Sequence, residues 1–312
     1  QPPWLQVRWE ESGIMGVFNP MFDIRNFNAN EIDNMRVTTF QKYNQLLDEY
    51  TTEYQSLDAT QNFLNSLTNF PLLKGVQTNL YKCFLPIGWK LVKNNGINGF
   101  LHPEGVYDDP NGGMLRREIY KRLKYHFQFQ NTLKLFPEVH QSRKFSINIF
   151  KNNSTSTLFT NMSNLFIPLT IELSLNSSPD KILFGLKHNG KWNTDGHHSR
   201  ILKVNNNYLT LFSKLYDREG TSPEEARLPM LYSQELLNVL EKIEYYHLKI
   251  ESIEELYTST EMWHETNKTK KGLIEQKFGK HTIPILQGSH LFVANSFYRT
   301  SNKNKFTNVD MT

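Results

Sequence analysis

The spacing of apolar residues in the first quarter of the chain predicts helices. From Asn30 onwards, apolar and aromatic side chains recur at alternating three- and four-residue steps, which places them on one helical face: Phe40, Tyr43, Leu47, Tyr50 and Tyr54. Asp58 opens a capping-box pattern, so we expect a second helix from there to about Asn69. Residues 5–29 have the pattern of a loop. A helical pair over about 30–70 is longer than an ordinary connection in an α/β domain, and we interpret it as an insertion.

Residues 79–151 alternate between helical and strand-like patterns. The expected elements, in chain order, are a helix that ends at the Asn94-Asn95-Gly96 turn, a strand over Ile97–Leu101, a helix over 114–124, and strands over Tyr125–Asn131 and Phe145–Lys151. A helix, a glycine turn and an apolar strand in this order are typical of an α/β repeat.

Beyond residue 155 the pattern is weaker, and we predict a second region over 156–312. The expected elements are strands over Leu165–Leu175 (an edge strand, because Pro168 interrupts it), Lys181–Leu186 and Arg200–Val204, a helix start at Ser222-Pro223, a longer helix with Leu236 to Ile250 on its inner face, and strands over Ile283–Leu286 and His290–Val293.

Composition narrows the class of protein. The chain has 312 residues, of which 38% are hydrophobic and 21% charged, which is globular rather than disordered. The formal charge of +4 permits a polyanionic partner without requiring one. The single cysteine, Cys83, excludes an internal disulfide and a cysteine-based zinc site, and we expect it to be a packing residue. With no apolar run of ~18 residues and no signal-peptide pattern, we expect a cytoplasmic protein without a membrane partner.

The first four residues, Gln1-Pro2-Pro3-Trp4, are the main candidate for chemistry. Two prolines remove two backbone N–H donors and fix φ, so the loop is stiff and its carbonyls can accept hydrogen bonds. The Gln1 side chain can accept a second bond, and the Trp4 ring can stack on a flat group. Such a loop suits a planar amino substrate, although four residues alone also fit an ordinary polyproline turn.

Two further groups of side chains are candidates for binding a phosphate or a metal ion. Arg117, Lys121 and Lys124 fall on one face of the helix expected over 114–124, where they form either a solvated face or a contact to phosphates. His188, Asp195, His197 and His198 lack any established metal-ligand spacing. We therefore expect no metal site.

Several motifs follow the first four residues in a fixed order: Asn79-Leu80-Tyr81 with Phe84, His102-Pro103-Glu104-Gly105, Leu135-Phe136-Pro137 and Lys144-Phe145-Ser146. Together with Pro-Pro-Trp, this series resembles the gamma-type adenine-N6 DNA methyltransferases, and most closely the Eco57I-like restriction-modification methylases. The resemblance is densest over 72–150 and continues more weakly through 190–194, 259–266 and 288–290. It covers the family's catalytic loop through the start of its target-recognition region. Position 1 departs from the family, which has Asn, Asp or Ser where this chain has Gln1.

The resemblance implies an α/β fold. Residues 1–155 would form the C-terminal half of a Rossmann-like S-adenosylmethionine-dependent methyltransferase sheet, with the helical insertion at about 30–70. Residues 156–312 would form an α+β target-recognition region. It implies transfer of a methyl group from S-adenosylmethionine to a flipped adenine in double-stranded DNA, within a restriction-modification or phage-defence system. The roles that it implies are catalytic for Gln1, Pro2, Pro3 and Trp4, base stacking for Trp4 and Phe136, the edge of the cofactor pocket for Asn79, Tyr81 and Phe84, and DNA-backbone contact for Arg117, Lys121, Lys124 and Lys144.

Some expectations concern what surrounds this chain. The glycine-rich cofactor motif is expected upstream, in the other half of the same polypeptide, and a nuclease or helicase partner is possible. Gln1 carries one methylene more than Asn, about 1.5 Å of extra reach. Two alternatives therefore stay open: a catalytically impaired, methyltransferase-like DNA-binding specificity module, and a methyltransferase that acts on RNA or on a protein amide.

Overall fold

The computed structural model describes residues 1–24, 27, 29–76, 79–152 and 157–246, and the backbone of two strands further on. The chain divides into two compact units, Gln1–His247 and Leu248–Thr312. In the second unit, β8 (Ile274–Phe278) pairs antiparallel with β9 (Lys305–Val309). The strands expected at Ile283–Leu286 and His290–Val293, and the motif residues 259–266 and 288–290, lie outside the described residues.

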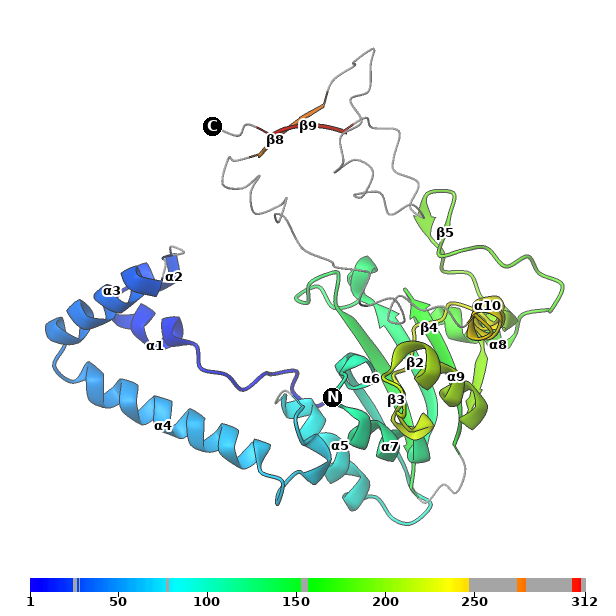
Figure 1. The fold of residues 1–312 in the computed structure, drawn as a ribbon, viewed down its shortest axis with the longest axis horizontal. Helices are drawn as coiled ribbons and strands as arrows, with labels where there is room; N and C mark the ends of the chain where they lie inside the picture. Colours follow the sequence, from blue (N-terminus) through cyan, green and yellow to red (C-terminus); the bar gives the residue numbers. More distant parts are fainter. Residues whose placement is uncertain are drawn as a thin grey trace. The chain divides into compact units, whose positions relative to one another are not determined.

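A mixed five-stranded sheet forms the centre of the first unit, with the strand order β1-β3-β2-β4-β7 (Figure 1). The strands are β1 (Ile97–Pro103), β2 (Leu123–Gln130), β3 (Lys144–Lys151), β4 (Leu158–Leu165) and β7 (Leu202–Asn205). β3 is antiparallel to both β1 and β2, so β1 and β2 run in the same direction. β4 is parallel to β2, and β7 is antiparallel to β4. The α/β class predicted from the sequence is confirmed, and the sheet is compatible with a Rossmann-like fold.

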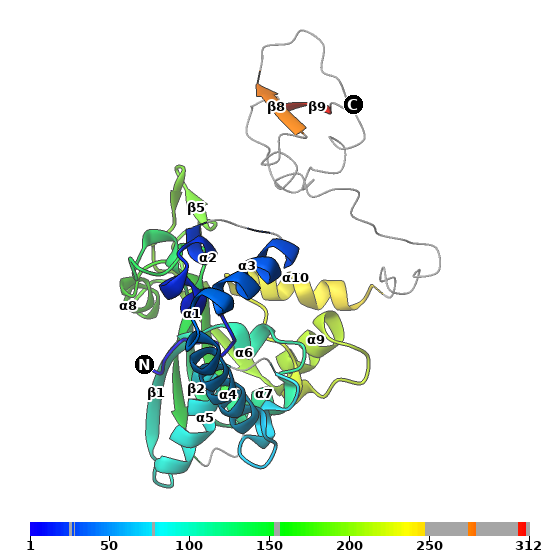
Figure 2. The ribbon, with the colours of Figure 1, turned by 90° about the vertical axis from the view of Figure 1, so that its left-hand side faces the viewer.

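Helices cover one face of this sheet. α5 (Leu80–Leu91), α6 (Gly105–Asp108), α7 (Gly113–Arg122) and α9 (Asn206–Tyr216) lie to one side of β1 and β2 in Figure 2, and α8 (Leu169–Leu175) lies to the other. The main core lies under the covering helices and includes Leu85, Ile119, Phe150 and Phe212. Cys83 is buried there, as predicted. A smaller core, with Phe129 and Phe145, lies on the opposite face.

The turn between α5 and β1 lies where the Asn94-Asn95-Gly96 sequence predicts it. Asn95 takes a left-handed conformation, with φ of 63°, which Asn tolerates better than most residues. The Asn152 side chain donates to the carbonyl oxygens of Trp89 and Val92, both at 3.0 Å. These bonds satisfy two carbonyls at the end of α5 that have no partner within the helix.

The N-terminal helices differ from the prediction. Residues 5–29 contain α1 (Glu11–Phe18) and α2 (Met21–Ile24) rather than a loop alone. α3 (Ala29–Lys42) is followed by α4, which runs unbroken from Leu46 to Asn65. Asp58 therefore lies inside α4 and caps no helix; its carboxylate accepts from the Asn62 side chain at 3.0 Å. The aromatic stripe predicted on one helix is divided between α3 and α4: the ring centroids of Phe40 and Tyr50 are 5.3 Å apart across the break, whereas Leu47 and Tyr54 are exposed.

Two predictions beyond residue 155 were wrong, and a third was right only in position. Leu165–Leu175 is not a strand, because β4 ends at Leu165 and α8 begins after Pro168, whose fixed φ suits a helix start. Lys181–Leu186 is a loop that leads into a short hairpin of β5 (Lys187–His188) and β6 (Lys191–Trp192). A helix does start after Ser222, with Pro223 at its first position as predicted, but it is only the 3-10 turn η4 (Pro223–Glu225).

The remaining elements complete the unit. They are α10 (Gln234–Glu244) and the 3-10 turns η1 (Pro71–Leu73), η2 (Asn131–Leu133) and η3 (His198–Arg200). β4 and β7 follow residue 155 and belong to the same sheet as β1. The boundary at residue 155 between a catalytic and a target-recognition region stays a prediction. In the described part of the chain, no helix has both the length and the apolar character needed to cross a membrane.

Candidate functional site

The N-terminal segment is hydrogen-bonded to the sheet near the carboxyl end of β1. The Trp4 indole Nε1 donates to the Leu101 carbonyl at 3.3 Å, and the Leu80 amide donates to the Leu5 carbonyl at 2.9 Å. Pro2 is buried, whereas Gln1 and Pro3 are exposed. The Pro-Pro-Trp segment thus has a fixed backbone, and the Gln1 side chain before it lies in solvent.

Trp4 and Phe136 meet in an aromatic cluster with Phe145. The Trp4 and Phe136 ring centroids are 5.7 Å apart at an interplanar angle of 68°, and those of Phe136 and Phe145 are 4.9 Å apart at 81°. Asn131 holds the Phe136 backbone from both sides: its amide group donates to the Phe136 carbonyl and its oxygen accepts from the Phe136 N–H, each at 2.9 Å. The two residues predicted to stack on a base are therefore neighbours. They touch edge to face, so a base stacked between them requires the rings to separate.

A cleft of about 400 Å³ lies beside this segment. It is lined by Gln6, Asn79, Tyr81, Lys82, Pro103, Glu104, Gly105, Asp108, Ser142, Arg143 and Lys144. Two of the three residues predicted at the cofactor edge, Asn79 and Tyr81, lie here. The third, Phe84, does not line the cleft and is 41% exposed.

Asn79 and Tyr81 present different surfaces to the cleft. The Asn79 side-chain oxygen is buried and has no hydrogen-bond partner within the described part of the chain, which makes it an acceptor for a bound group. The Tyr81 ring stacks on His102, with centroids 5.2 Å apart and an interplanar angle of 18°. A Cβ at Gly105 would lie 3.2 Å from the Tyr81 hydroxyl, so a glycine allows this close approach.

A buried ion pair joins Glu104, which lines the cleft, to His126, which does not. Glu104 follows β1, and its Oε1 lies 3.1 Å from Nε2 of His126 on β2. His126 Nδ1 lies 2.6 Å from the Asn161 side-chain oxygen. Burial opposes both charges, but the mutual attraction outweighs it, so the pKa of His126 is raised and that of Glu104 is lowered. With two acceptors around it, the imidazole is best described as protonated and the carboxylate as ionised.

His102 lies next to this pair in the opposite protonation state. Burial lowers the pKa of His102 to about 4. Its Nδ1 bonds the Pro103 carbonyl at 2.8 Å, and its Nε2 accepts from the Asn148 side chain at 3.0 Å. Tyr107 donates to the same Asn148 at 2.6 Å. A neutral imidazole fits this arrangement.

The site offers a mixed set of polar groups. The Asn79 oxygen and the Glu104 carboxylate can accept from amino or hydroxyl groups, and the side chains of Arg143 and Lys144 can pair with an anion. Among the described residues, no three His, Cys, Asp or Glu side chains are grouped to hold a metal. The sequence drew attention to Glu104 as part of a motif but not to His126 or Asn161.

The basic residues predicted to contact DNA lie on three different elements, α7, β2 and β3. α7 ends at Arg122, so Lys124 lies on β2 and does not share a helical face with Arg117 and Lys121; that expectation was wrong. Arg117 bonds Glu225 at 2.5 Å, and Lys121 bonds Glu118 at 2.8 Å. Lys144 lies apart from them, in the wall of the cleft. Contact to DNA stays a prediction for all four residues.

Comparisons with known proteins give only distant structural likeness. No family profile matches the chain, and no curated protein matches it. One similar structure is an ATP-dependent Type ISP restriction-modification enzyme, LlaBIII, bound to DNA, with 11% identity and a TM-score of 0.26 over 52% of this chain. Another is from a study of complex assembly and conformational transition of the type I restriction-modification system, with 15% identity and a TM-score of 0.30 over 64% of this chain. The chain spans 9% and 41% of the lengths of these two proteins, and the scores are too low to place it in a family.

Proposed function

We propose that this chain forms the substrate side of an adenine-N6 DNA methyltransferase site, in a restriction-modification or phage-defence system. One observation carries the proposal. Pro-Pro-Trp and the Phe-Pro motif lie far apart in the sequence, yet Trp4 and Phe136 are in contact near the carboxyl end of β1. The cleft with Asn79 and Tyr81 adjoins them through Gln6 of the same N-terminal segment. These are the positions at which the sequence resemblance predicts base stacking and the cofactor edge.

The chemistry asks for two acceptors that hold the amino group of a flipped adenine. The Gln1 side-chain oxygen and the Pro2 carbonyl are the candidates, and the prolines keep that backbone rigid. Trp4 and Phe136 supply the aromatic surfaces, each contributing about 1–3 kcal/mol to stacking. No covalent intermediate with the protein is needed, which agrees with the packing role of Cys83.

The cleft fits the edge of a cofactor site. Its unpartnered Asn79 oxygen can accept from an amino or hydroxyl group, and Tyr81 provides an apolar surface. S-adenosylmethionine, when bound, supplies the methyl group. Asn79 and Tyr81 would hold its outer edge, and the remaining contacts belong to the predicted upstream region.

The identity of position 1 favours a second candidate function, a methyltransferase-like module that binds DNA without catalysis. Gln1 is exposed and about 1.5 Å longer than Asn, and a misplacement of ~1 Å can cost on the order of 100-fold in rate. Replacing Gln1 with Asn in the full-length protein separates the two functions. Methylation that rises with Gln1→Asn indicates impaired chemistry in the natural protein, and an unchanged, measurable rate indicates that Gln1 is competent or irrelevant. Methylation by neither protein indicates a binding module.

The stacking role of Phe136 tests the proposal. In the full-length protein, we expect Phe136→Ala to lower the methylation rate of adenine-containing duplexes by about 10- to 100-fold, because one stacking surface is lost. Phe136→Tyr should keep most of the rate. Phe63→Ala, at an exposed position on α4, is the control for aromatic loss elsewhere. A Phe136→Ala protein that is folded and fully active would remove the clamp from the account.

A further inference from the structure

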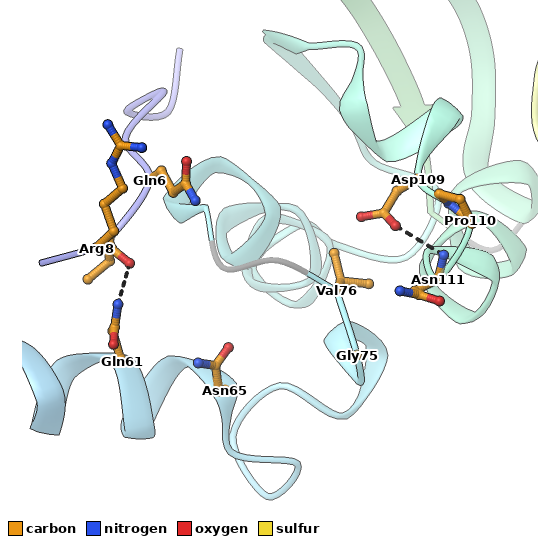
Figure 3. A pocket seen from close by; sticks show the side chains of 10 residues that line it. Gln6, Arg8, Gln61, Asn65, Gly75, Val76, Asp109, Pro110 and Asn111 are labelled. Carbon is orange, nitrogen blue, oxygen red and sulfur yellow. Dashed lines mark hydrogen bonds between the residues drawn. The ribbon is translucent and has the colours of Figure 1, made fainter. Parts of the chain in front are cut away.

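A second hollow, of about 750 Å³, lies next to the cleft and has no role in the proposed methyl transfer. Four segments form it: the N-terminal segment, α4, the turn after η1, and the turn after α6 (Figure 3). Gln6 lines both the hollow and the cleft, so the two are neighbours. Its volume falls within the range of about 300–1,000 Å³ that is usual for small-molecule sites.

Carboxamide side chains dominate the polar lining. They come from three different segments: Gln6, Gln61 and Asn65, and Asn111. Figure 3 shows Gln61 and Asn65 extending from α4 toward the other walls. The Gln6 and Asn111 carboxamides each carry a donor and an acceptor, whereas the Gln61 amide already donates to the Val7 carbonyl. Val7, Val76 and Pro110 supply the apolar part of the lining.

The hollow carries little net charge. The Asp109 carboxylate accepts from the Lys82 ammonium at 3.0 Å and from the Asn111 N–H at 3.0 Å, so its charge is compensated from outside the hollow. The Arg8 guanidinium pairs with Glu10, and its side chain is 61% exposed. A phosphate or a cation would therefore find no strong counter-charge here. A neutral ligand that carries donors and acceptors side by side would find hydrogen-bond partners.

Several contacts fix the walls before any ligand arrives. The Gln61 amide donates to the Val7 carbonyl at 2.7 Å, which ties α4 to the N-terminal segment. Gly75 has φ of +73°, a conformation that favours glycine, and a Cβ there would lie 4.0 Å from the Asn111 Cβ. Walls of this kind lower the entropic cost of binding.

We propose that this hollow binds a nucleobase. Asn and Gln side chains pair with adjacent donor and acceptor atoms of a base, and adenine N6 and N7 are their usual partners. An extended peptide also alternates donors and acceptors, but it binds along a sheet edge, and no strand residue lines the hollow. The base can come from an extrahelical nucleotide of DNA or from a free nucleoside. This binding site is separate from the proposed methyl-transfer site, and its test measures binding alone, without catalysis.

The test is a calorimetric titration of the full-length protein with adenosine, guanosine, cytidine and thymidine, and with a duplex that contains one unpaired adenine. Three variants accompany it. Asn111→Leu removes the carboxamide, Asn111→Asp leaves acceptors only, and Asn62→Leu changes α4 outside the hollow. A fourth variant, Asn79→Leu, alters the neighbouring cleft.

We expect adenosine to bind most tightly, Asn111→Leu to weaken it about tenfold or more, and Asn62→Leu to leave it unchanged. Asn79→Leu alters the cleft, so the adenosine binding that remains in this variant reports the hollow. Asn111→Asp should shift preference toward cytidine, whose N4 donates to a carboxylate. Tighter binding of the unpaired-adenine duplex than of adenosine identifies DNA as the source, and the reverse order identifies a free nucleoside. Binding that is lost in Asn79→Leu but kept in Asn111→Leu would overturn the inference and leave the proposed function standing. Equal binding of N-acetylglycinamide, or no binding of any base, would also overturn it.

Discussion

At the scale of single residues, His126 balances the charge of Glu104, a buried carboxylate that lines the cleft. The pKa of His126 is raised above 6.5, so its stabilising effect is full below pH 6.5 and is lost as the pH rises through the raised value. The pKa of Glu104 is lowered below 4.5, so its effect is present above pH 4.5 and is lost as the pH falls through the lowered value. The pair therefore stabilises the fold most between about pH 4.5 and 6.5.

This linkage predicts the pH dependence of unfolding. We expect the free energy of unfolding, from urea titrations, to decrease from pH 6.5 to 9 in the natural protein and to vary less in His126→Gln. His126→Gln should itself cost about 3–5 kcal/mol, because it leaves a buried carboxylate unpaired. The double variant Glu104→Gln/His126→Gln removes both charges and should be more stable than His126→Gln alone.

His102 acts in the opposite direction and in a different pH range. Its pKa of about 4 means that the unfolded chain binds a proton before the folded chain does, so stability is lost as the pH falls from 6.5 toward 4. The loss that begins above pH 6.5 therefore reports His126, and near pH 9 the Cys83 thiol, whose pKa is raised by burial, adds to the loss. A natural protein whose stability is flat from pH 6.5 to 9 would contradict a protonated His126.

The residues of the site were only partly predictable from the sequence. Glu104 stands in a recognisable motif directly after a strand, but His126 and Asn161 are alternating polar positions in strands that read as ordinary sheet residues. They become a site because β2 lies beside β4, where His126 opposes Asn161. The contact of Trp4 with Phe136 also needs the sheet, since no local spacing relates the two residues.

At the scale of elements, α4 is the element whose structure differs most from its sequence prediction. A helix that started at Asp58 would place Ala59 at its first position, where proline is tolerated. In the unbroken α4, position 59 is interior, and Ala59→Pro should cost about 3 kcal/mol or more and reduce the helical signal in far-ultraviolet circular dichroism. Ala59→Gly, with an expected cost of about 1 kcal/mol, is the matched control. A Pro variant as stable as the Gly variant would mean that two helices meet there.

Elements with strong local signals were predicted well. β1, β3 and α5 are bounded by a turn at Asn95 and by strict alternation, and those signals act on the backbone directly. Leu165–Leu175 was mistaken for a strand because its apolar residues fit either period, and Pro168 was taken as an interruption although it is the N-cap residue of α8. The 3-10 turn at Pro223–Glu225 shows the same limit: a good helix start does not determine how long the helix continues.

At the scale of the whole molecule, the formal charge of +4 says little until the charges are placed. Arg117 and Lys121 are paired with glutamates, whereas Lys144 lines the cleft. Each lysine that neutralises a DNA phosphate adds about one to the slope of log affinity against log salt. We expect Lys144→Gln to reduce this slope by about one and Lys121→Gln to leave it nearly unchanged, in fluorescence-anisotropy titrations of a duplex. Equal reductions would mean that the Lys121–Glu118 pair opens on DNA.

The central claim is that Gln1–Trp4, the cleft and Phe136 form the substrate side of an adenine-N6 methyltransferase site. The most direct measurement is nucleoside mass spectrometry of duplex DNA incubated with the full-length protein and S-adenosylmethionine that carries a ¹³C-labelled methyl group. The account predicts labelled N6-methyladenine, reduced by at least an order of magnitude in Trp4→Ala, which loses one stacking surface. A label found only on cytosine, RNA or protein, or no label from a protein that binds the DNA, would contradict it.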